Sequence, residues 1–547
     1  MSGFPFSARL VALPLWGLLA LREGTYGRGG PVLHARIGSR VSMPTPDLLR
    51  QVALAPDIRG LHLVIEHVGG GWASLRAIRD ALGRIKDAGK PVYIELESCG
   101  NAELYLSSVA SRVWLRPMGE VGALGIAATM RFAGDALARF GLQFDVEAAG
   151  AYKAAGEMFT RAWASGENRE ATTALVDGLQ QELIARVAEG RKLTEAAVAS
   201  ALADGPLSAA DAQARGLVDA IAYPDEVHAA LEQVFGEGHL VRGLHHWLKR
   251  RVARQRVAQW MEGRRQVVVV HLEGPIVDGE GTPGAVVVAA EPACRMVDAL
   301  WEDDDVAGVV LAVQSPGGSA LASDRIWRSV VRLGEKKPVV AVFRDVAASG
   351  GYYLAAPARE IFVEPNTITG SIGVVGGKLV IRDALARLGV HSETVGGPDA
   401  GMYAPDAPFT PRQRAGFRRS LERFYRGFVE RVAAGRKRPY DDVEPLARGR
   451  VWTGAQAVAN GLADRFGGVH DGVARVRELA GEANLARVDL RVAPRSGRIA
   501  RLVRGWIGAA LPLHLVERLM LSPLTLFLLG GARGPLAVWP YEIDVHD

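Results

Sequence analysis

The chain has 547 residues, of which 48% are hydrophobic and 23% are charged, and its formal net charge at pH 7 is +5. The hydrophobic and charged fractions are those of a globular protein and exclude a disordered chain. The net charge is small for this length, and we expect no nucleic-acid partner. The length exceeds what one hydrophobic core supports, which predicts two large domains with terminal extensions. The two cysteines lack the clustering of a disulfide framework or a zinc site, and we expect neither a metal nor a cofactor.

The apolar stretches near the two termini each have two interpretations. Leu10 to Leu21 is an uncharged run between two arginines, shorter than the roughly 20 residues that span a bilayer. It fits either a helix packed on the protein or a membrane attachment. The segment 499–529 is rich in leucine and valine with interspersed arginines. It fits either a segment that lies on a membrane surface or one that caps a domain.

An internal repeat with a shift near 248 residues organises the chain. Asp57 to Gly70 (DIRGLHLVIEHVGG) aligns with Asp305 to Gly318 (DVAGVVLAVQSPGG), and Asp135 to Gly141 (DALARFG) aligns with Asp383 to Gly389 (DALARLG). The repeat predicts two copies of one domain. A solenoid is excluded because the period is far too long. We therefore expect an N-terminal apolar segment (1–29), a first copy (30–240), a basic linker helix (241–262), a second copy (263–485) and an apolar, basic extension (486–547).

Each copy is predicted to be an α/β domain. Short apolar runs rich in β-branched residues end in glycine or polar turns, and longer segments with helical spacing lie between them. This alternation is typical of a mostly parallel sheet covered by helices on both faces. The predicted strands include 61–65, 92–96, 267–272, 309–313 and 339–343, and the predicted helices include 319–333 and 412–434.

A serine in the second copy follows a predicted strand. We expect this strand to end at Phe343 and a turn over 344–348 to lead into Ser349 and a helix. A serine at such a junction exposes its hydroxyl, and N–H groups at the helix start can stabilise an oxyanion. Ordinary glycine-rich turns have the same appearance. The candidate oxyanion donors are glycines of this turn and of the earlier turn QSPGGS, namely Gly350, Gly317 and Gly318.

A serine nucleophile needs a base, and the sequence favours lysine over histidine. No GxSxG motif surrounds Ser349, and none of the 12 histidines lies near the glycine turns. A lysine can act as the base when burial or another influence lowers its pKa. Lys153 is the candidate because it lies in a largely uncharged stretch, 150–160, although a solvated surface lysine is the ordinary interpretation of such a residue.

Four motifs, in this order along the chain, resemble the long form of the signal peptide peptidase A family: YKAAGEMFT, SPGG, ASGGYYLAA and TGSIGV. The resemblance covers roughly residues 30–485. It implies two tandem domains of the Clp protease/crotonase fold and a serine endopeptidase. It further implies Ser349 as nucleophile, Lys153 as base and Ser371 of the TGSIG motif as the residue that orients the lysine.

The same resemblance implies partners and a location. The expected substrates are cleaved signal peptides or other apolar peptides, and the expected assembly is a homo-oligomeric ring such as a tetramer. The expected location is the bacterial inner membrane, with the enzyme facing the periplasm or bound peripherally to the membrane surface.

The repeat supports a division of roles between the copies. At the shift of 248, Ser349 aligns with Asn101 and Ser371 aligns with an alanine, while Lys153 falls near Gly401, where the second copy has no lysine. Each copy therefore lacks what the other retains. Two rival functions on the same fold stay open: an acyl-CoA-processing enzyme of the crotonase type, which needs none of these side chains, and a catalytically inactive membrane scaffold.

Overall fold

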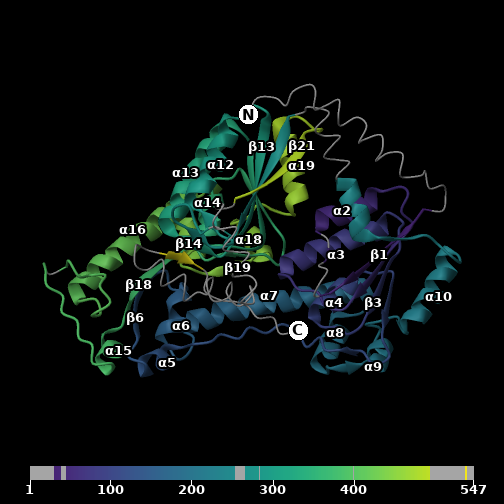
Figure 1. The fold of residues 1–547 in the computed structure, drawn as a ribbon, viewed down its shortest axis with the longest axis horizontal. Coiled ribbons are helices and arrows are strands. Elements are labelled where there is room, and N and C mark those ends of the chain that lie inside the picture. Colours follow the sequence, from purple (N-terminus) through teal and green to yellow (C-terminus); the bar gives the residue numbers. More distant parts are fainter. Residues whose placement is uncertain are drawn as a thin grey trace. The chain divides into compact units, whose positions relative to one another are not determined.

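A computed structural model describes residues 30–38, 43, 45–252, 265–282, 284–397, 399–492 and 536–538 (Figure 1). The predicted N-terminal segment 1–29 and most of the extension 486–547 lie outside these residues. The chain divides into two compact units, the first with residues 1–127, 178–264 and 545–547, and the second with residues 128–177 and 265–544. Among the described residues, no helix is both long enough and apolar enough to cross a membrane.

The first unit is built on a parallel sheet with the strand order β8-β4-β3-β2-β1-β9. Its strands are β1 (Val32–Ile37), β2 (Gly60–Ile65), β3 (Val92–Leu96), β4 (Arg112–Leu115), β8 (Ala220–Ile221) and β9 (Val241–Gly243), and β5 (Glu120–Val121) pairs separately with β7 (Leu207–Ser208). Its helices include α2 (Pro46–Leu54), α3 (Trp72–Asp87), α4 (Asn101–Ser107), α8 (Glu195–Ala203), α9 (Ala209–Ala214) and α10 (Pro224–Phe235), and α7 (Gly166–Arg191) begins in the second unit and ends in the first. The predicted linker helix 241–262 is wrong at its start, because 241–243 pair with β1 as β9; residues 244–252 are helical, and 253–262 are outside the described part.

The second unit repeats this sheet. Its strand order β20-β16-β15-β13-β10-β21 corresponds position by position to that of the first unit, and every one of these pairs is parallel. The strands are β10 (Gln266–Glu273), β13 (Val306–Ser315), β15 (Val339–Ala348), β16 (Glu360–Val363), β20 (Arg465–Phe466) and β21 (Ala486–Arg491), and β17 (Ile368–Gly370) and β19 (Val451–Thr453) continue from β15. The shared topology is the structural counterpart of the sequence repeat.

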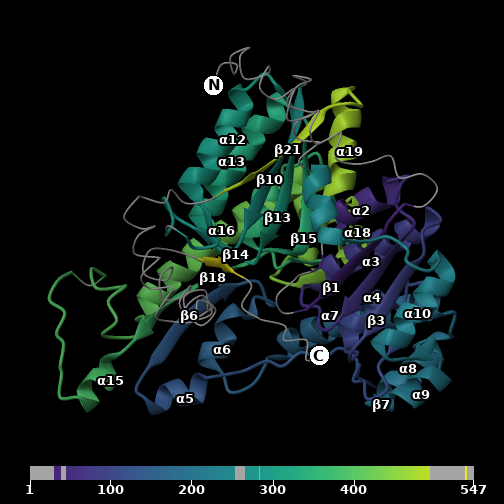
Figure 2. The same cartoon turned by 45° about the vertical axis from the view of Figure 1, so that its right-hand side comes forward.

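Helices cover both faces of the second unit's sheet (Figure 2). Successive residues of a strand point to opposite faces. In β10, Val268 and Val270 accordingly pack in the core that includes α12 (Ala290–Glu302) and α13 (Ala320–Lys336), whereas Val267 and Val269 pack in the core that includes α19 (Val469–Ala480). Strands buried on both faces read as continuous apolar runs, which is why these strands were predictable. The remaining helices of the unit include α5 (Gly134–Arg139), α6 (Glu157–Thr160), α14 (Gly350–Ala355), α15 (Arg382–Arg387), α16 (Pro411–Arg436), α17 (Tyr440–Val443) and α18 (Gly454–Ala459).

Residues 128–177 belong to the first copy in sequence but pack in the second unit. The strand β6 (Gln143–Ala149) in this segment pairs antiparallel with β18 (Val374–Val380) of the second copy. Arg414 of α16 binds Asp145 and Glu147 of β6 at 2.7 and 2.5 Å, so ion pairs reinforce the strand pairing. This sheet of the second unit therefore contains strands from both copies. Segment 128–177 also places Lys153, four residues after β6, in the same unit as Ser349.

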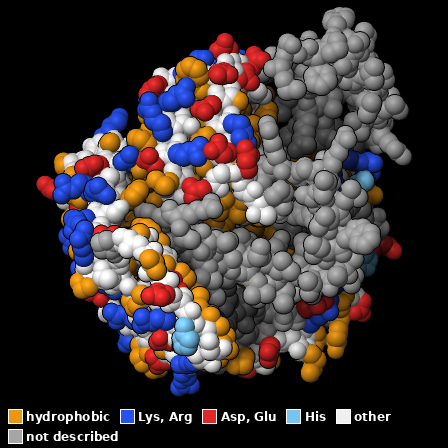
Figure 3. All heavy atoms as spheres, turned by 60° about the vertical axis from the view of Figure 1, so that its left-hand side comes forward, with side chains coloured by type: hydrophobic (Ala, Val, Ile, Leu, Met, Phe, Trp, Pro, Cys, Tyr) orange, Lys and Arg blue, Asp and Glu red, His pale blue; other side chains and the backbone are white. Residues whose placement is uncertain are grey.

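Charged side chains on the second unit are interspersed rather than segregated. Figure 3 shows Lys and Arg mixed with Asp and Glu over one face of the molecule. On α12 and α13, Arg295 pairs with Glu280 and Arg325 pairs with Glu291, each at 2.7 Å. Local pairing of opposite charges leaves little long-range field from this surface.

Candidate active site

Ser349 lies directly at the end of β15. The predicted turn over 344–348 is wrong, because β15 continues through these residues, and 346–348 pair with β17. Ser349 then caps the N-terminus of α14 with φ at +55°, in the left-handed region that costs a non-glycine residue about 1–3 kcal/mol. Its N–H donates to the Gly370 carbonyl at 2.8 Å and its carbonyl accepts from Tyr353 N–H at 2.9 Å, so the surrounding strand and helix hold this strained conformation.

The structure brings Lys153 to Ser349. The Lys153 Nζ lies 2.8 Å from Ser349 Oγ, 3.0 Å from Ser371 Oγ and 3.0 Å from the Ser371 carbonyl oxygen. All three side chains are buried, with exposed fractions of 5% for Lys153, 0% for Ser349 and 2% for Ser371. The three residues predicted from widely separated motifs thus form one hydrogen-bonded group.

Burial controls the charge of Lys153. Removal of the ammonium from water lowers its pKa from 10.5 to about 7. Among the described residues, Lys153 forms no ion pair that would favour the charged state. An amine with this pKa is substantially neutral at pH 7 to 8 and can accept a proton from the Ser349 hydroxyl.

The candidate oxyanion glycines lie next to Ser349. A Cβ added to Gly350 would come within 3.3 Å of the Gly317 Cα and 2.5 Å of Ser323 Oγ, so the two glycine segments are in close contact. The Gly317 N–H donates to Ser315 Oγ at 3.2 Å. A Cβ on Gly318 would overlap the Ile276 carbonyl, which means that only glycine fits there.

A backbone segment that the sequence did not reveal, 448–450, holds both sides of the site. The Arg448 carbonyl accepts from Tyr152 N–H at 2.7 Å, and the Arg450 carbonyl accepts from Ser371 N–H at 2.7 Å. Between them, Gly449 donates to the Ile372 carbonyl at 2.8 Å. We call residues 448–450 the clamp. The Arg450 guanidinium also donates to Tyr152 Oη at 3.3 Å. The other contacts described here use main-chain atoms, which no side-chain pattern in the sequence indicates.

Gly449 also lies close to the backbone of Lys153. Its φ is +82°, and an added Cβ would lie 2.5 Å from the Lys153 N and 2.7 Å from its Cα. Only glycine permits this approach. The position of the lysine backbone therefore depends on a residue almost 300 positions away in the sequence.

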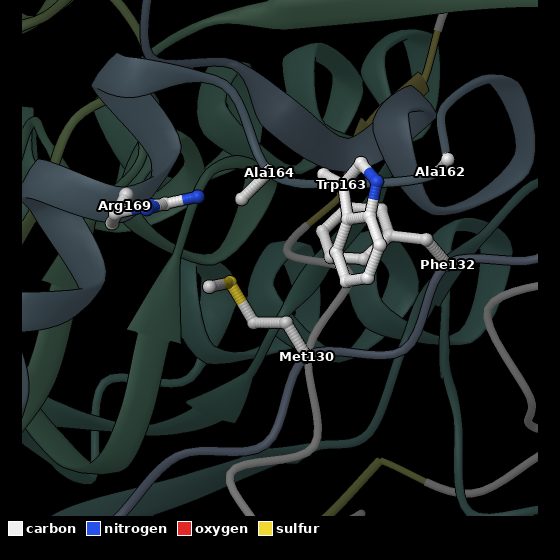
Figure 4. A pocket seen from close by; sticks show the side chains of 6 residues that line it. All are labelled: Met130, Phe132, Ala162, Trp163, Ala164 and Arg169. Carbon is white, nitrogen blue, oxygen red and sulfur yellow. The ribbon is translucent and has the colours of Figure 1, made fainter.

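A small pocket and a larger one are both lined by residues near the start of α7. The small pocket is lined by Lys153, Ser371, Asn168 and Thr172, among others. The larger has a volume of about 410 Å³ and is lined by Met130, Phe132, Ala162, Trp163, Ala164 and Arg169 (Figure 4). Thr172 Oγ1 lies 3.7 Å from Met130 Sδ, so a lining residue of the small pocket contacts a lining residue of the larger one. We call the larger one the apolar pocket.

The corresponding place in the first unit lacks these groups. Asn101, which aligns with Ser349, exchanges two hydrogen bonds of 3.0 Å with the backbone of Gly125 and is buried. A further buried lysine, Lys378, donates to the Met402 and Ala404 carbonyls and does not belong to the Ser349 group. In the described structure, the nucleophile candidate and its basic neighbour therefore occur together in the second unit.

Comparison with known proteins identifies the family. The chain matches peptidase family S49 over residues 84–236 and 332–483, once in each copy. The chain belongs to peptidase family S49. Membership in S49 implies a serine peptidase, in agreement with the resemblance to signal peptide peptidase A, and the two matches confirm the tandem domains.

Curated S49 relatives align with most of the chain. The chloroplastic serine protease SPPA of Arabidopsis thaliana is 30% identical over 458 residues, which cover 82% of this chain and 67% of the relative. Protease 4 of Salmonella typhi is 32% identical over 449 residues, 79% of this chain and 71% of the relative. The alignments extend over both copies of this S49 chain.

Two solved structures are also similar to parts of the chain. A membrane-bound stomatin-specific protease mutant covers 42% of it at 16% identity with a TM-score of 0.28, which is 98% of that structure. A ClpP1 mutant from Listeria monocytogenes covers 39% at 15% identity with a TM-score of 0.25, which is 95% of that structure. At these scores the two alignments add no weight to the S49 match.

Proposed function

We propose that this S49 peptidase is an endopeptidase that cleaves apolar peptides with a Ser349–Lys153 dyad, in which Ser371 orients the lysine. The observation that carries the proposal is the pair of contacts of one buried amine, 2.8 Å to Ser349 Oγ and 3.0 Å to Ser371 Oγ. A nucleophile within hydrogen-bond reach of its base, with the base held by a third group, is the arrangement that covalent catalysis requires.

The chemistry follows from these positions. Neutral Lys153 takes the Ser349 proton as Oγ bonds to the carbonyl carbon of the scissile bond. The resulting ammonium gives that proton to the leaving amine as the C–N bond breaks, which leaves an ester on Ser349. Water, deprotonated by Lys153, then hydrolyses the ester and restores both groups.

Backbone N–H groups stabilise the oxyanion in this proposal. The Gly350 N–H is adjacent to the nucleophile at the start of α14. Because the Gly317 N–H is already bonded to Ser315, we assign the second donor to Gly318. Each donor of this kind contributes about 2.7–4 kcal/mol to transition-state stabilisation.

The apolar pocket supports apolar substrates, including cleaved signal peptides. Met130, Phe132 and Trp163 contribute apolar surface, and Trp163 is 77% exposed and thus available to a ligand (Figure 4). A substrate side chain would gain about 25 cal/mol for each Å² of apolar surface buried there. Its lining residue Met130 contacts Thr172 of the small pocket that contains Lys153 and Ser371, which supports binding of a peptide near the dyad.

We further propose a homo-oligomeric ring at the surface of the bacterial inner membrane. α5 and α15 lie together beside β6 and β18 (Figure 1), and the Ala384 N–H donates to the Gly141 carbonyl at 3.1 Å. Phe140 and Leu388, at the ends of these helices, are 70% and 78% exposed. Large apolar side chains exposed together support a contact between copies of the chain. The apolar sequences 10–21 and 499–529 support membrane contact, on the periplasmic face or peripherally.

A mutant cycle tests the dyad. Ser349→Ala and Lys153→Met should each reduce cleavage of a fluorogenic apolar peptide about 1,000-fold or more, and the double mutant should be no worse than either. Lys378→Met is the matched control, since Lys378 is a buried lysine of the same unit outside the site. Activity of Ser349→Ala within threefold of wild type would overturn the proposal. A folded wild-type protein without peptidase activity would favour the scaffold, and acyl-CoA turnover by Ser349→Ala would favour the crotonase type.

A further inference from the structure

A short strand from the C-terminal extension completes the second sheet of the second unit. The strand β22 (Leu536–Val538) lies between β14 (Gly317–Ser319) and β18 in a sheet with the order β12-β11-β14-β22-β18-β6, in which β11 is Ile276–Val277 and β12 is Val288–Ala289. It is antiparallel to both neighbours. Val538, Ala537 and Leu536 face Gly317, Gly318 and Ser319, respectively, and Leu536 also faces Val375. The sheet is thus continuous only through this segment.

Both neighbours of β22 adjoin residues of the candidate active site. β14 contains Gly317 and Gly318, and Gly317 is in close contact with Gly350 beside Ser349. β18 begins at Val374, three residues after Ser371. Adjacent strands lie about 4.8 Å apart, so the backbone of β22 passes within one strand spacing of Gly318, the residue of β14 proposed to bind the oxyanion.

A substrate needs the same place. To present a carbonyl to Ser349 and Gly318, a peptide must run along β14, whose glycines carry no side chain to keep another backbone away. An extended peptide adds to a sheet by main-chain hydrogen bonds, which are independent of its sequence. The strand edges of β14 and β18 offer these bonds, and β22 uses both edges.

We propose that β22 occupies the strand position of the substrate, so the chain's own C-terminal segment competes with peptides for the active site. This inference rests on the proposed function. The site recognises an extended peptide that joins β14 and β18 in antiparallel orientation. The sequence Leu536-Ala537-Val538 is apolar and uncharged, and thus belongs to the substrate class proposed above.

The full-length chain with Ala537→Pro tests the competition. Proline removes the backbone N–H of the central residue and is excluded from the interior of a sheet, so β22 should leave its position. A segment bound about nine-tenths of the time raises the apparent KM about tenfold, so the variant should lower KM by up to this factor at unchanged kcat. Ala532→Pro, in the same extension but outside β22, is the control and should leave KM unchanged.

A synthetic peptide of residues 533–541 supplies the converse test. It should inhibit the Ala537→Pro protein competitively, and a peptide of the same composition in scrambled order should inhibit it less. An unchanged KM in Ala537→Pro, or inhibition that is not competitive, would overturn the proposal.

Hydrogen exchange separates this proposal from the proposed function. In Ala537→Pro, and in the same variant with Ser349→Ala, the amides of 317–319 and 374–376 should exchange faster than in the matching protein with Ala537. Unchanged exchange would show that β22 does not fill the position and would overturn the inference. If every form lacks peptidase activity, the proposed function fails, and exchange still decides whether β22 lies there.

Discussion

Gly449→Ala should disable the site although Ser349, Lys153 and Ser371 are all kept. An added Cβ would lie 2.5 Å from the Lys153 N and 2.7 Å from its Cα. Carbon atoms pack at about 3.5–4.0 Å, so relief of the overlap requires the backbone of Lys153 or of the clamp to move by about 1 Å. The Nζ–Oγ contact of 2.8 Å cannot survive such a shift unchanged. Misplacement by about 1 Å costs about 100-fold in rate, which is the loss we expect in kcat.

The control separates this displacement from backbone strain. Gly481 also has a left-handed φ, +71°, but an added Cβ there would meet nothing within 4 Å. Gly481→Ala should therefore carry the strain of about 1–2 kcal/mol alone and keep its activity. Both variants are to be compared by kcat on a fluorogenic peptide and by thermal unfolding. Activity of Gly449→Ala within threefold of Gly481→Ala would refute the idea that the clamp positions Lys153.

Further predictions concern pH, specificity and assembly. Peptidase activity should rise as the pH passes through about 7 and then level off, because burial lowers the pKa of Lys153 to about 7; a profile flat from pH 6 to 9 would contradict this. The free energy of unfolding of wild type, relative to Lys153→Met, should increase by roughly 3–5 kcal/mol between pH 7 and 10.5, since the unfolded lysine binds a proton that the folded one has lost. Denaturant titrations at both pH values measure this difference, and a constant difference would argue against a lysine that is neutral in the folded state. Trp163→Ala should lower kcat/KM for apolar peptides about tenfold but leave the labelling of Ser349 by a small phosphonate unchanged; equal losses in both would mean a general disturbance of the site. Phe140→Glu with Leu388→Glu should yield monomers in sedimentation, and an unchanged oligomer would place the contact elsewhere.

Much of the fold was predictable because its signals are local. The runs 92–96 and 267–272 became β3 and β10 with boundaries shifted by at most one residue, since strands buried on both faces are continuously apolar. The tandem organisation was predictable from the repeat, and the family match confirms it. The polar residues Arg344 and Asp345 suggested a turn, but strand pairing beyond them with β17 extends β15 to Ala348.

Long-range contacts were not predictable from sequence patterns. β6 joins the second unit because it pairs with β18, and nothing in either strand specifies a partner more than 200 residues away. The motifs predicted that Ser349, Lys153 and Ser371 act together. They did not predict the clamp, whose hydrogen bonds to Tyr152, Ser371 and Ile372 include three between main-chain atoms. The pairing of β22 with β14 is likewise a backbone interaction between distant segments.

The most direct test of the Ser349–Lys153 dyad is the rate at which a peptidyl phosphonate labels the protein as a function of pH, with the labelled residue identified by mass spectrometry. The account predicts a single modified residue, Ser349, with a labelling rate that rises through an apparent pKa near 7 in wild type. In Lys153→Met this rise should be absent and the rate at pH 8 about 1,000-fold lower. Labelling of a different residue, or the same rate and pH dependence in Lys153→Met, would contradict the dyad.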